Sequence, residues 1–143
     1  MSVDSIKHSM EPTYKLYFPE PRPLSISLQD LITQNSVNLL GQDNKAFCGR
    51  CSCNTSQSAS RSFSGKVIIL EVMRVSICRG IPRKSSIGVT FSLRDYITVP
   101  GSSEKFRVIA VCHHSGSVNS GHWYSGIVLE NGSWFMIDDL STA

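Results

Sequence analysis

The chain has 143 residues, which suits one domain, and a chain of this length buries roughly two-thirds of the surface that its unfolded form exposes. Its content of 41% hydrophobic and 17% charged residues is that of an ordinary globular protein and excludes a disordered one. The net charge of +3 is mild, and the basic residues are scattered rather than interleaved with aromatic ones, so nucleic acid is not expected as a partner.

The cysteines and the first residues indicate where the protein works. The five cysteines are an odd number, and three of them crowd together at Cys48, Cys51 and Cys53, unlike those of a secreted disulfide scaffold. The start of the chain contains no apolar stretch, which predicts that there is no signal peptide. The longest apolar run, Val67 to Leu70, is far shorter than the roughly 20 residues that span a bilayer. We therefore expect an intracellular protein, cytoplasmic or nuclear, that is neither secreted nor in contact with a membrane.

A strand and a helix are predicted in the first quarter of the chain. Residues 14–18 form a strand-like run that ends at three closely spaced prolines, because proline donates no ladder hydrogen bond and restricts the residue before it. Ser27 and Asp30 resemble a capping pair, and the apolar residues that follow have helical spacing. The pattern predicts a short helix over about residues 28–35.

Strands dominate the remainder of the chain. The serine-rich segment 52–65 has no period, which is typical of a loop or of the tip of a mobile hairpin. Residues 67–72 form an apolar run of the kind found in buried strands. Four further strands are expected, at residues 88–96, 106–112, 122–129 and 133–137.

The last two of these strands are predicted to form a hairpin that brings a histidine close to two carboxylates. Asn131-Gly132 supplies the positive φ that tight hairpin turns need. His122 opens the hairpin, and Asp138 and Asp139 end it. A histidine beside a carboxylate can take the proton of a thiol or hydroxyl nucleophile, because the carboxylate fixes the tautomer and stabilises the imidazolium. The ordinary alternative is a solvated pair of acids and a histidine without a catalytic role.

Which acid faces His122 depends on the loop, since side chains alternate between the two faces of a strand and a slip of one residue exchanges them. A two-residue turn at Asn131-Gly132 places Asp139 on the face of His122. A three-residue loop from Glu130 to Gly132, with a glycine bulge, places Asp138 there instead. The sequence leaves both arrangements open.

Three motifs lie in the C-terminal third of the chain. The first is F-x-V-x-A-V-x-x-H-x-G at residues 106–116, the second is G-H-W at residues 121–123, and the third is W-F-M-I-D-D at residues 134–139. They resemble the closing motifs of the ubiquitin-specific proteases, which are Y-x-L-x-A-V-x-x-H-x-G, G-H-Y and W-Y-x-(F/x)-(N/D)-D. The chain departs from the family pattern at Trp123, where tyrosine is usual.

The resemblance implies roles for single residues. In these proteases the histidine after the glycine is the general base, and the residue four past the tryptophan is the third catalytic member, which assigns His122 and Asp138. Asp139 matches a neighbouring acidic position, as a supporting or alternative member. The residues that the same motifs imply for substrate binding, beside a narrow channel for the ubiquitin tail, are His114, Gly116, Gly121 and Trp123.

The likeness extends backwards with falling specificity. Residues 67–75 resemble the family's L-x-x-x-L-K-R-F strand, with Val75 where an aromatic residue is usual, and residues 24–40 resemble its S-L-x-D-L-L helix. We therefore divide the chain into an N-terminal extension, residues 1–13, and the C-terminal part of a catalytic domain, residues 14–143. The resemblance implies an α+β, mainly antiparallel, partial papain-like fold that contains the palm and part of the fingers, without the thumb.

One cysteine pair has the spacing of half a zinc site. Two thiolates at the spacing of Cys48 and Cys51 can hold one zinc ion. In the family such a pair joins a second pair upstream, whereas this chain offers only Cys53, which is one residue too close, or His8. The sequence predicts half of a structural zinc site at most, a reduced surface knuckle is the preferred interpretation, and no other cofactor is expected.

The family's nucleophile has no counterpart in these motifs. A complete domain begins with a cysteine box, G-L-x-N-x-G-N-(T/S)-C-(Y/F), at the start of a helix whose field stabilises the thiolate. No such box occurs in the printed sequence, and Cys78 and Cys112 are interpreted as small buried or edge hydrophobes. A domain without its nucleophile segment also predicts exposed apolar surface and poor solubility.

The function implied by the resemblance is that of a deubiquitinase, a thiol-dependent protease that hydrolyses ubiquitin–lysine isopeptide bonds, here without its nucleophile segment. Its partners would be conjugates of ubiquitin or of a ubiquitin-like protein. The alternatives are an inactive pseudoprotease that binds ubiquitin, and an isopeptidase relative that acts on SUMO or another ubiquitin-like protein.

Overall fold

The computed structural model describes residues 12–39, 46–48, 53–55, 58–60, 62–63 and 65–139. In these residues there is one helix, α1 (Leu28–Gln34). Its N-cap is Ser27, whose Oγ accepts a hydrogen bond from the Asp30 backbone N–H at 3.0 Å and donates one to Asp30 Oδ2 at 2.7 Å. The predicted helix and its capping pair are confirmed; the helix ends at Gln34, and Asn35 is its C-cap.

The other regular elements of the described structure are short strands. In chain order they are β1 (Tyr14–Leu16), β2 (Ser25–Ser27), β3 (Val37–Leu39), β4 (Ala46–Cys48), β5 (Cys53–Thr55), β6 (Ser58–Ser60), β7 (Leu70–Val72), β8 (Val75–Cys78), β9 (Ile81–Lys84), β10 (Gly88–Thr90), β11 (Ile97–Thr98), β12 (Lys105–Phe106), β13 (Ala110–Gly116), β14 (Gly121–Val128) and β15 (Trp134–Ile137).

The strands pair mostly in antiparallel fashion. Two pairs, β1 with β7 and β2 with β10, are parallel. The other pairs among the described residues are antiparallel: β3 with β6, β4 with β5, β8 with β9, β11 with β12, and the three-stranded sheet β13-β14-β15. The expected α+β, mainly antiparallel fold is confirmed.

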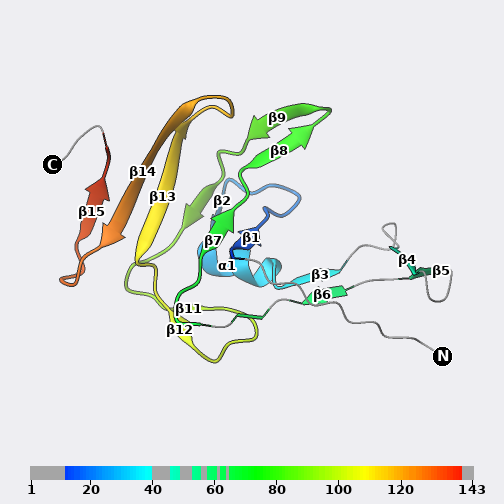
Figure 1. Cartoon of the computed structure of the whole chain (residues 1–143), viewed down its shortest axis with the longest axis horizontal. Coiled ribbons are helices and arrows are strands. Elements are labelled where there is room, and N and C mark those ends of the chain that lie inside the picture. The colour runs from blue at the N-terminus through cyan, green and yellow to red at the C-terminus, as the bar shows by residue number, and fades with distance from the viewer. Residues whose placement is uncertain are drawn as a thin grey trace.

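The hydrophobic core surrounds helix α1. Leu31 and Ile32 of the helix are fully buried, together with Leu16 of β1. The buried apolar residues that complete this core come from β1, β2, α1, β11 and the residues beside β10 and β11: Tyr14, Ile26, Leu28, Ile87, Ile97 and Val99. The three-stranded sheet contributes no side chain to this set and lies to one side of the helix, as Figure 1 shows.

Two features of the middle of the chain differ from the sequence prediction. The apolar run 67–72 is not a buried strand, because Val67 is 70% exposed and Ile69 is 59% exposed, and only its end forms β7. The serine-rich segment 52–65, predicted to be a loop or the tip of a mobile hairpin, includes strands β5 and β6, which pair antiparallel with β4 and β3.

A further hairpin, β8–β9, was not predicted. Its two-residue turn, Arg79-Gly80, has positive φ at both positions, 50° and 76°. This is the backbone that two-residue hairpins favour, since it matches the twist of the strands. The helix α1, with seven residues, falls well short of the roughly 20 that a bilayer requires, and the described residues contain no other helix.

Candidate active site

The loop between β14 and β15 decides the register of the hairpin. Leu129 donates a backbone hydrogen bond to the Ser133 carbonyl at 2.8 Å, and Gly132 donates one to the Leu129 carbonyl, also at 2.8 Å. The loop therefore contains three residues, and the last of them, Gly132, has φ of +80°. This is the three-residue loop with a glycine bulge rather than the two-residue turn.

This register places Asp138 beside His122. The pairing of Ser125 with Ile137 continues to Tyr124 opposite Asp138, so Asp138 and His122 share one face of the sheet. His122 Nε2 lies 2.7 Å from Asp138 Oδ1. Asp139 is the more distant acid, with its Oδ1 3.6 Å from the same nitrogen and its side chain 84% exposed.

The contact fixes the chemistry of the imidazole ring. A carboxylate only accepts hydrogen bonds, so the hydrogen in the contact belongs to Nε2 of His122. In the neutral ring Nδ1 then carries no hydrogen and presents a lone pair. Asp138 is held more firmly than Asp139, since its side chain is 24% exposed. A carboxylate in this position can orient a histidine that acts as a general base.

The same face of the sheet carries two aromatic contacts. The imidazole of His113 stacks on the ring of Tyr124, with centroids 5.0 Å apart and an interplanar angle of 15°. The indole of Trp134 lies over Gly126, where an added Cβ would be 2.3 Å from a ring carbon. These contacts cover the strands beside the His122–Asp138 pair. The sequence analysis did not single out His113, Tyr124 or Gly126.

The four residues expected to bind substrate gather at one end of the β13–β14 hairpin. Gly116 pairs with Gly121, and His114 pairs with Trp123, with ring centroids 4.8 Å apart. By strand alternation His114 and Trp123 lie on the face opposite to that of His122. Trp123 is 65% exposed, and a role for any of the four in substrate binding stays a prediction.

The two cysteines whose side chains the structure describes, Cys78 and Cys112, do not contact His122. Cys78 and Cys112, which were interpreted as small buried or edge hydrophobes, are both exposed, so the buried alternative is wrong; Cys112 lies on β13, an edge strand of its sheet. Cys112 Sγ lies 3.5 Å from Ser125 Oγ, on the face opposite to that of His122. No thiol among the described side chains contacts His122.

The expected zinc half-site cannot be located. Cys51 lies outside the described residues, and Cys48 is described only as backbone of β4, so zinc binding there stays a prediction. Elsewhere, ligand atoms of His122, Asp138 and Asp139 lie within 4.8 Å of one another. Nε2 of His122 and Oδ1 of Asp138 are already joined by a direct hydrogen bond, which favours acid–base chemistry at this place.

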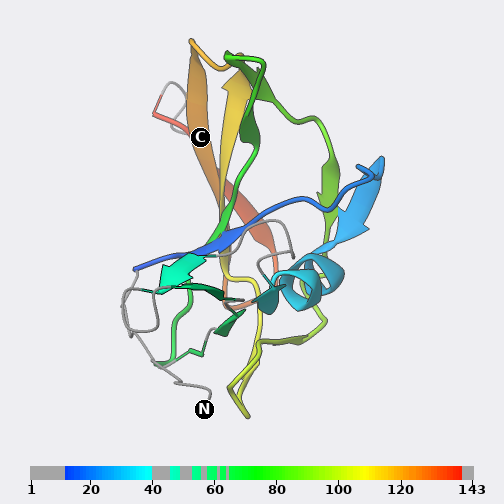
Figure 2. The same cartoon turned by 90° about the vertical axis from the view of Figure 1, so that its right-hand side faces the viewer.

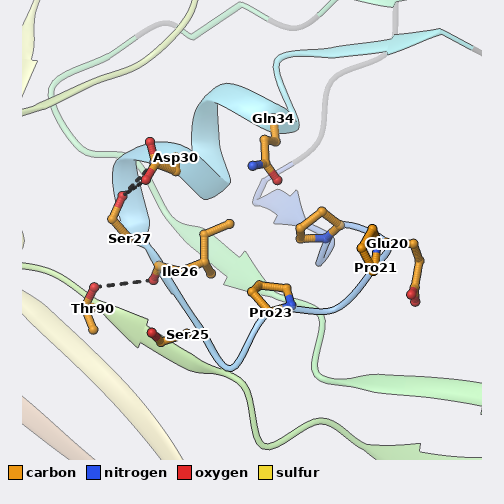
Figure 3. Close-up of a pocket in the computed structure, with 10 residues that line it drawn as sticks. Glu20, Pro21, Pro23, Ser25, Ile26, Ser27, Asp30, Gln34 and Thr90 are labelled. Carbon is orange, nitrogen blue, oxygen red and sulfur yellow. Dashed lines mark hydrogen bonds between the residues drawn. The ribbon is translucent and has the colours of Figure 1, made fainter.

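An open depression of about 460 Å³ lies away from this pair, at the N-terminal end of helix α1 (Figure 3). Its wall contains Pro21 and Pro23 on one side and the Ser27–Asp30 cap on the other. Neither His122 nor Asp138 lines it. The candidate active site is thus a pair of side chains on a sheet face and not an enclosed cavity.

Comparisons with known proteins identify the family. Residues 14–143 match the family described as ubiquitin carboxyl-terminal hydrolase. Ubiquitin carboxyl-terminal hydrolase 21 of Homo sapiens is 31% identical over 107 residues, which are 70% of this chain and 19% of that protein. Ubiquitin carboxyl-terminal hydrolase 17-like protein E of Mus musculus is 31% identical over 129 residues, which are 82% of this chain and 24% of that protein.

Solved structures show the same fold. A chain in the SAGA Ubp8/Sgf11/Sus1/Sgf73 DUB module bound to ubiquitin aldehyde matches with a TM-score of 0.65 at 18% identity, over 92% of this chain and 31% of that chain. A chain in the same module bound to monoubiquitin matches with a TM-score of 0.66 at 19% identity, over 92% of this chain and 30% of that chain. This chain spans about a fifth to a quarter of the length of the curated relatives it matches. The family match over residues 14–143 shows that the chain belongs to the ubiquitin carboxyl-terminal hydrolase family.

Proposed function

We propose that this chain supplies the general base, His122, and its orienting carboxylate, Asp138, to a thiol-dependent hydrolase of ubiquitin conjugates. The observation that carries the proposal is the 2.7 Å contact between His122 Nε2 and Asp138 Oδ1. It leaves Nδ1 as the basic nitrogen. The thiol comes from a cysteine other than Cys78 and Cys112, since neither contacts His122.

In the reaction His122 first accepts a proton and then gives it back. Nδ1 of His122 takes the proton of the thiol, and the thiolate attacks the carbonyl that joins the C-terminal glycine of ubiquitin to a lysine amine. The imidazolium, stabilised by Asp138, returns the proton to the leaving amine, and a thioester remains. Water then attacks the thioester with its proton taken by Nδ1, which releases the ubiquitin carboxylate and restores the thiol.

Ubiquitin is the proposed partner because family and fold both support it. The family description names ubiquitin, and two structurally similar DUB-module chains belong to complexes with ubiquitin aldehyde and with monoubiquitin. In this proposal the loop between Gly116 and Gly121 lies beside the ubiquitin tail. The proposed setting is intracellular, cytoplasmic or nuclear, because an odd number of cysteines, five, is unlike that of a secreted disulfide scaffold.

The adjacent acids provide a matched test of the base. Asp138→Ala and Asp139→Ala remove the same charge one residue apart, but only the first removes the 2.7 Å contact. Nitrogen NMR of the His122 ring reports the tautomer. We expect the unmodified chain and Asp139→Ala to hold the hydrogen on Nε2, and Asp138→Ala to lose that preference. An unchanged tautomer in Asp138→Ala, or a change only in Asp139→Ala, would contradict the assignment.

Two binding experiments test the partner and the source of the thiol. A titration of the chain with ubiquitin, with SUMO as the comparison, is expected to give binding to ubiquitin alone. Binding to SUMO alone would mean that the substrate is a conjugate of a ubiquitin-like protein. Binding to neither would contradict ubiquitin as the partner. A thiol-reactive ubiquitin probe should label no cysteine of this chain, and a labelled cysteine would show that the nucleophile is present after all.

A further inference from the structure

The ammonium group of Lys84 makes three hydrogen bonds to the end of the β13–β14 hairpin. Its Nζ donates to the His114 carbonyl at 2.7 Å, to the Gly116 carbonyl at 2.9 Å, and to His114 Nδ1 at 2.9 Å. An ammonium has three N–H donors and no acceptor. All its donors are therefore used on one short segment that lies 30 to 32 residues away in the sequence.

Lys84 is held by neutral acceptors rather than by an acid. The ion pairs found among the described residues join Arg22 to Glu20 and His122 to its two aspartates, and none of them includes Lys84. The side chain is only partly exposed, and a half-buried charge without a carboxylate partner depends on well-placed dipoles. The two carbonyls and the ring nitrogen supply those dipoles.

This contact determines the tautomer of His114. Because the ammonium can only donate, Nδ1 of His114 must accept, so in the neutral ring the hydrogen lies on Nε2. The ring in turn lies against Gly121, where an added Cβ would be 2.4 Å from Nε2 of His114. Gly121 immediately precedes His122. A continuous set of contacts thus leads from Lys84 to the backbone of the proposed base.

The contact joins two hairpins. Lys84 is the last residue of β9, and both views show the β8–β9 hairpin beside the end of β13 and β14 (Figures 1 and 2). Lys84 reaches β13 at the edge that pairs with no described strand, and it touches the ring of His114, which lies on the face opposite to that of His122 and Asp138. It touches none of the reacting groups.

We propose that Lys84 is a positioning residue of this site. It attaches the β13–β14 hairpin end to β8–β9, keeps His114 in its Nε2–H form against Gly121, and thereby fixes where His122 stands relative to the attacking thiol. The claim that Lys84 fixes the position of His122 relative to the thiol rests on the proposed function, because it takes His122 as the base. The attachment itself does not.

The test compares Lys84→Met with Arg83→Met in the 143-residue chain. Both variants remove one positive charge from β9, but the exposed Arg83 points to the other side of that strand. We expect Lys84→Met to lose the fixed His114 tautomer in nitrogen NMR and to speed amide exchange at residues 116–121 by roughly tenfold or more, as local opening allows. Arg83→Met should change neither. Equal spectra and equal exchange in the two variants would overturn the proposal.

One measurement requires no variant. In the unmodified chain, the neutral ring of His114 must carry its hydrogen on Nε2, and a hydrogen on Nδ1 would refute the contact with Lys84 even where Lys84→Met fails to fold.

An activity measurement separates this proposal from the proposed function. In a polypeptide that carries this chain together with its thiol, Lys84→Met should lower kcat/KM while the His122 tautomer is kept. Activity that survives His122→Ala would remove the function and leave the Lys84 attachment standing. Full activity of Lys84→Met with loss of the His114 tautomer would show that the attachment does not position the base.

Discussion

The region around helix α1 and the sheet β13-β14-β15 are built in different ways. Around α1, apolar side chains are buried, three of them completely, and Asn35, the one buried polar residue among those described, has all its side-chain groups bonded. In the sheet, Trp123 is 65% exposed, Met136 57% and Ile137 47%. The first region has the burial that stabilises a fold, while the second carries the candidate chemistry on strands held by backbone pairing and by Lys84.

The difference indicates that stability and chemistry are separable in this chain. Burial of apolar surface is the dominant favourable term in folding, and it is concentrated at α1. The sheet exposes apolar side chains on both faces, as expected for an incomplete domain, while the predicted poor solubility stays a prediction. Substitutions in the two regions should therefore affect different measurements, and four of them test this separation.

The largest effect is expected for His122→Ala. In a polypeptide that carries this chain together with its thiol, turnover should fall by roughly four orders of magnitude or more, since a nucleophile and its base act as one unit. Urea unfolding of the 143-residue chain should change by less than about 0.5 kcal/mol, because the ring is part-exposed. His113→Ala, a histidine on the same face, is the control and should stay active. If His122→Ala lost as much stability as a core variant, stability and chemistry would not be separable in this chain.

Leu31→Ala should produce the largest loss of stability. Leu31 is fully buried in the core, and truncation of such a side chain costs about 2–5 kcal/mol. The measurement is the free energy of unfolding in urea, with Leu24→Ala as control, because Leu24 is 96% exposed. The His122 tautomer should be the same in both variants at low denaturant. A changed tautomer in Leu31→Ala would mean that the core does shape the site.

Asn35→Ala should have an intermediate effect. Its Nδ2 donates to the Tyr17 and Leu31 carbonyls, and its Oδ1 accepts from the Tyr17 N–H, so the substitution leaves these groups without their partner. We expect a cost of about 1–3 kcal/mol in urea unfolding. Gln34→Ala, at an exposed neighbouring position, should cost far less. Equal costs would indicate that water replaces the lost bonds.

Ser27→Ala should have the smallest effect of the four. It removes the N-cap of α1, which is worth about 1 kcal/mol in typical helices. Thermal or urea unfolding measures the loss, and Ser25→Ala, two residues earlier and exposed, is the matched control. No difference between these two serines would show that the cap contributes nothing beyond the packing of the helix.

The sequence was informative where the signal is local. Ser27 and Asp30 predicted the start of α1, because both halves of a capping pair lie within one turn. Asn131-Gly132 predicted the β14–β15 hairpin, since glycine supplies the positive φ. The choice between Asp138 and Asp139 was beyond local reasoning, because loops of two and three residues both suit that glycine.

Other features depend on contacts that no local pattern reveals. The β8–β9 turn places Arg79 at positive φ, a position for which Asn or Asp would have been the usual signal. An apolar run such as 67–72 does not say which of its faces will be covered. Lys84 looks like any scattered lysine, because its three acceptors lie 30 or more residues further along the chain.

The three-residue loop that ends at Gly132 has a consequence for how this hairpin can vary. Asp138 faces His122 because Leu129 and Ser133 close a loop of three residues. Ser133 lies five positions before Asp138. A slip of one residue, with Asn131-Gly132 as a two-residue turn between Glu130 and Ser133, would turn Asp138 to the opposite face and bring Asp139 towards His122, with every side chain still present. The two backbone hydrogen bonds that close the loop thus choose the acid that faces His122, without a change in any residue of the hairpin.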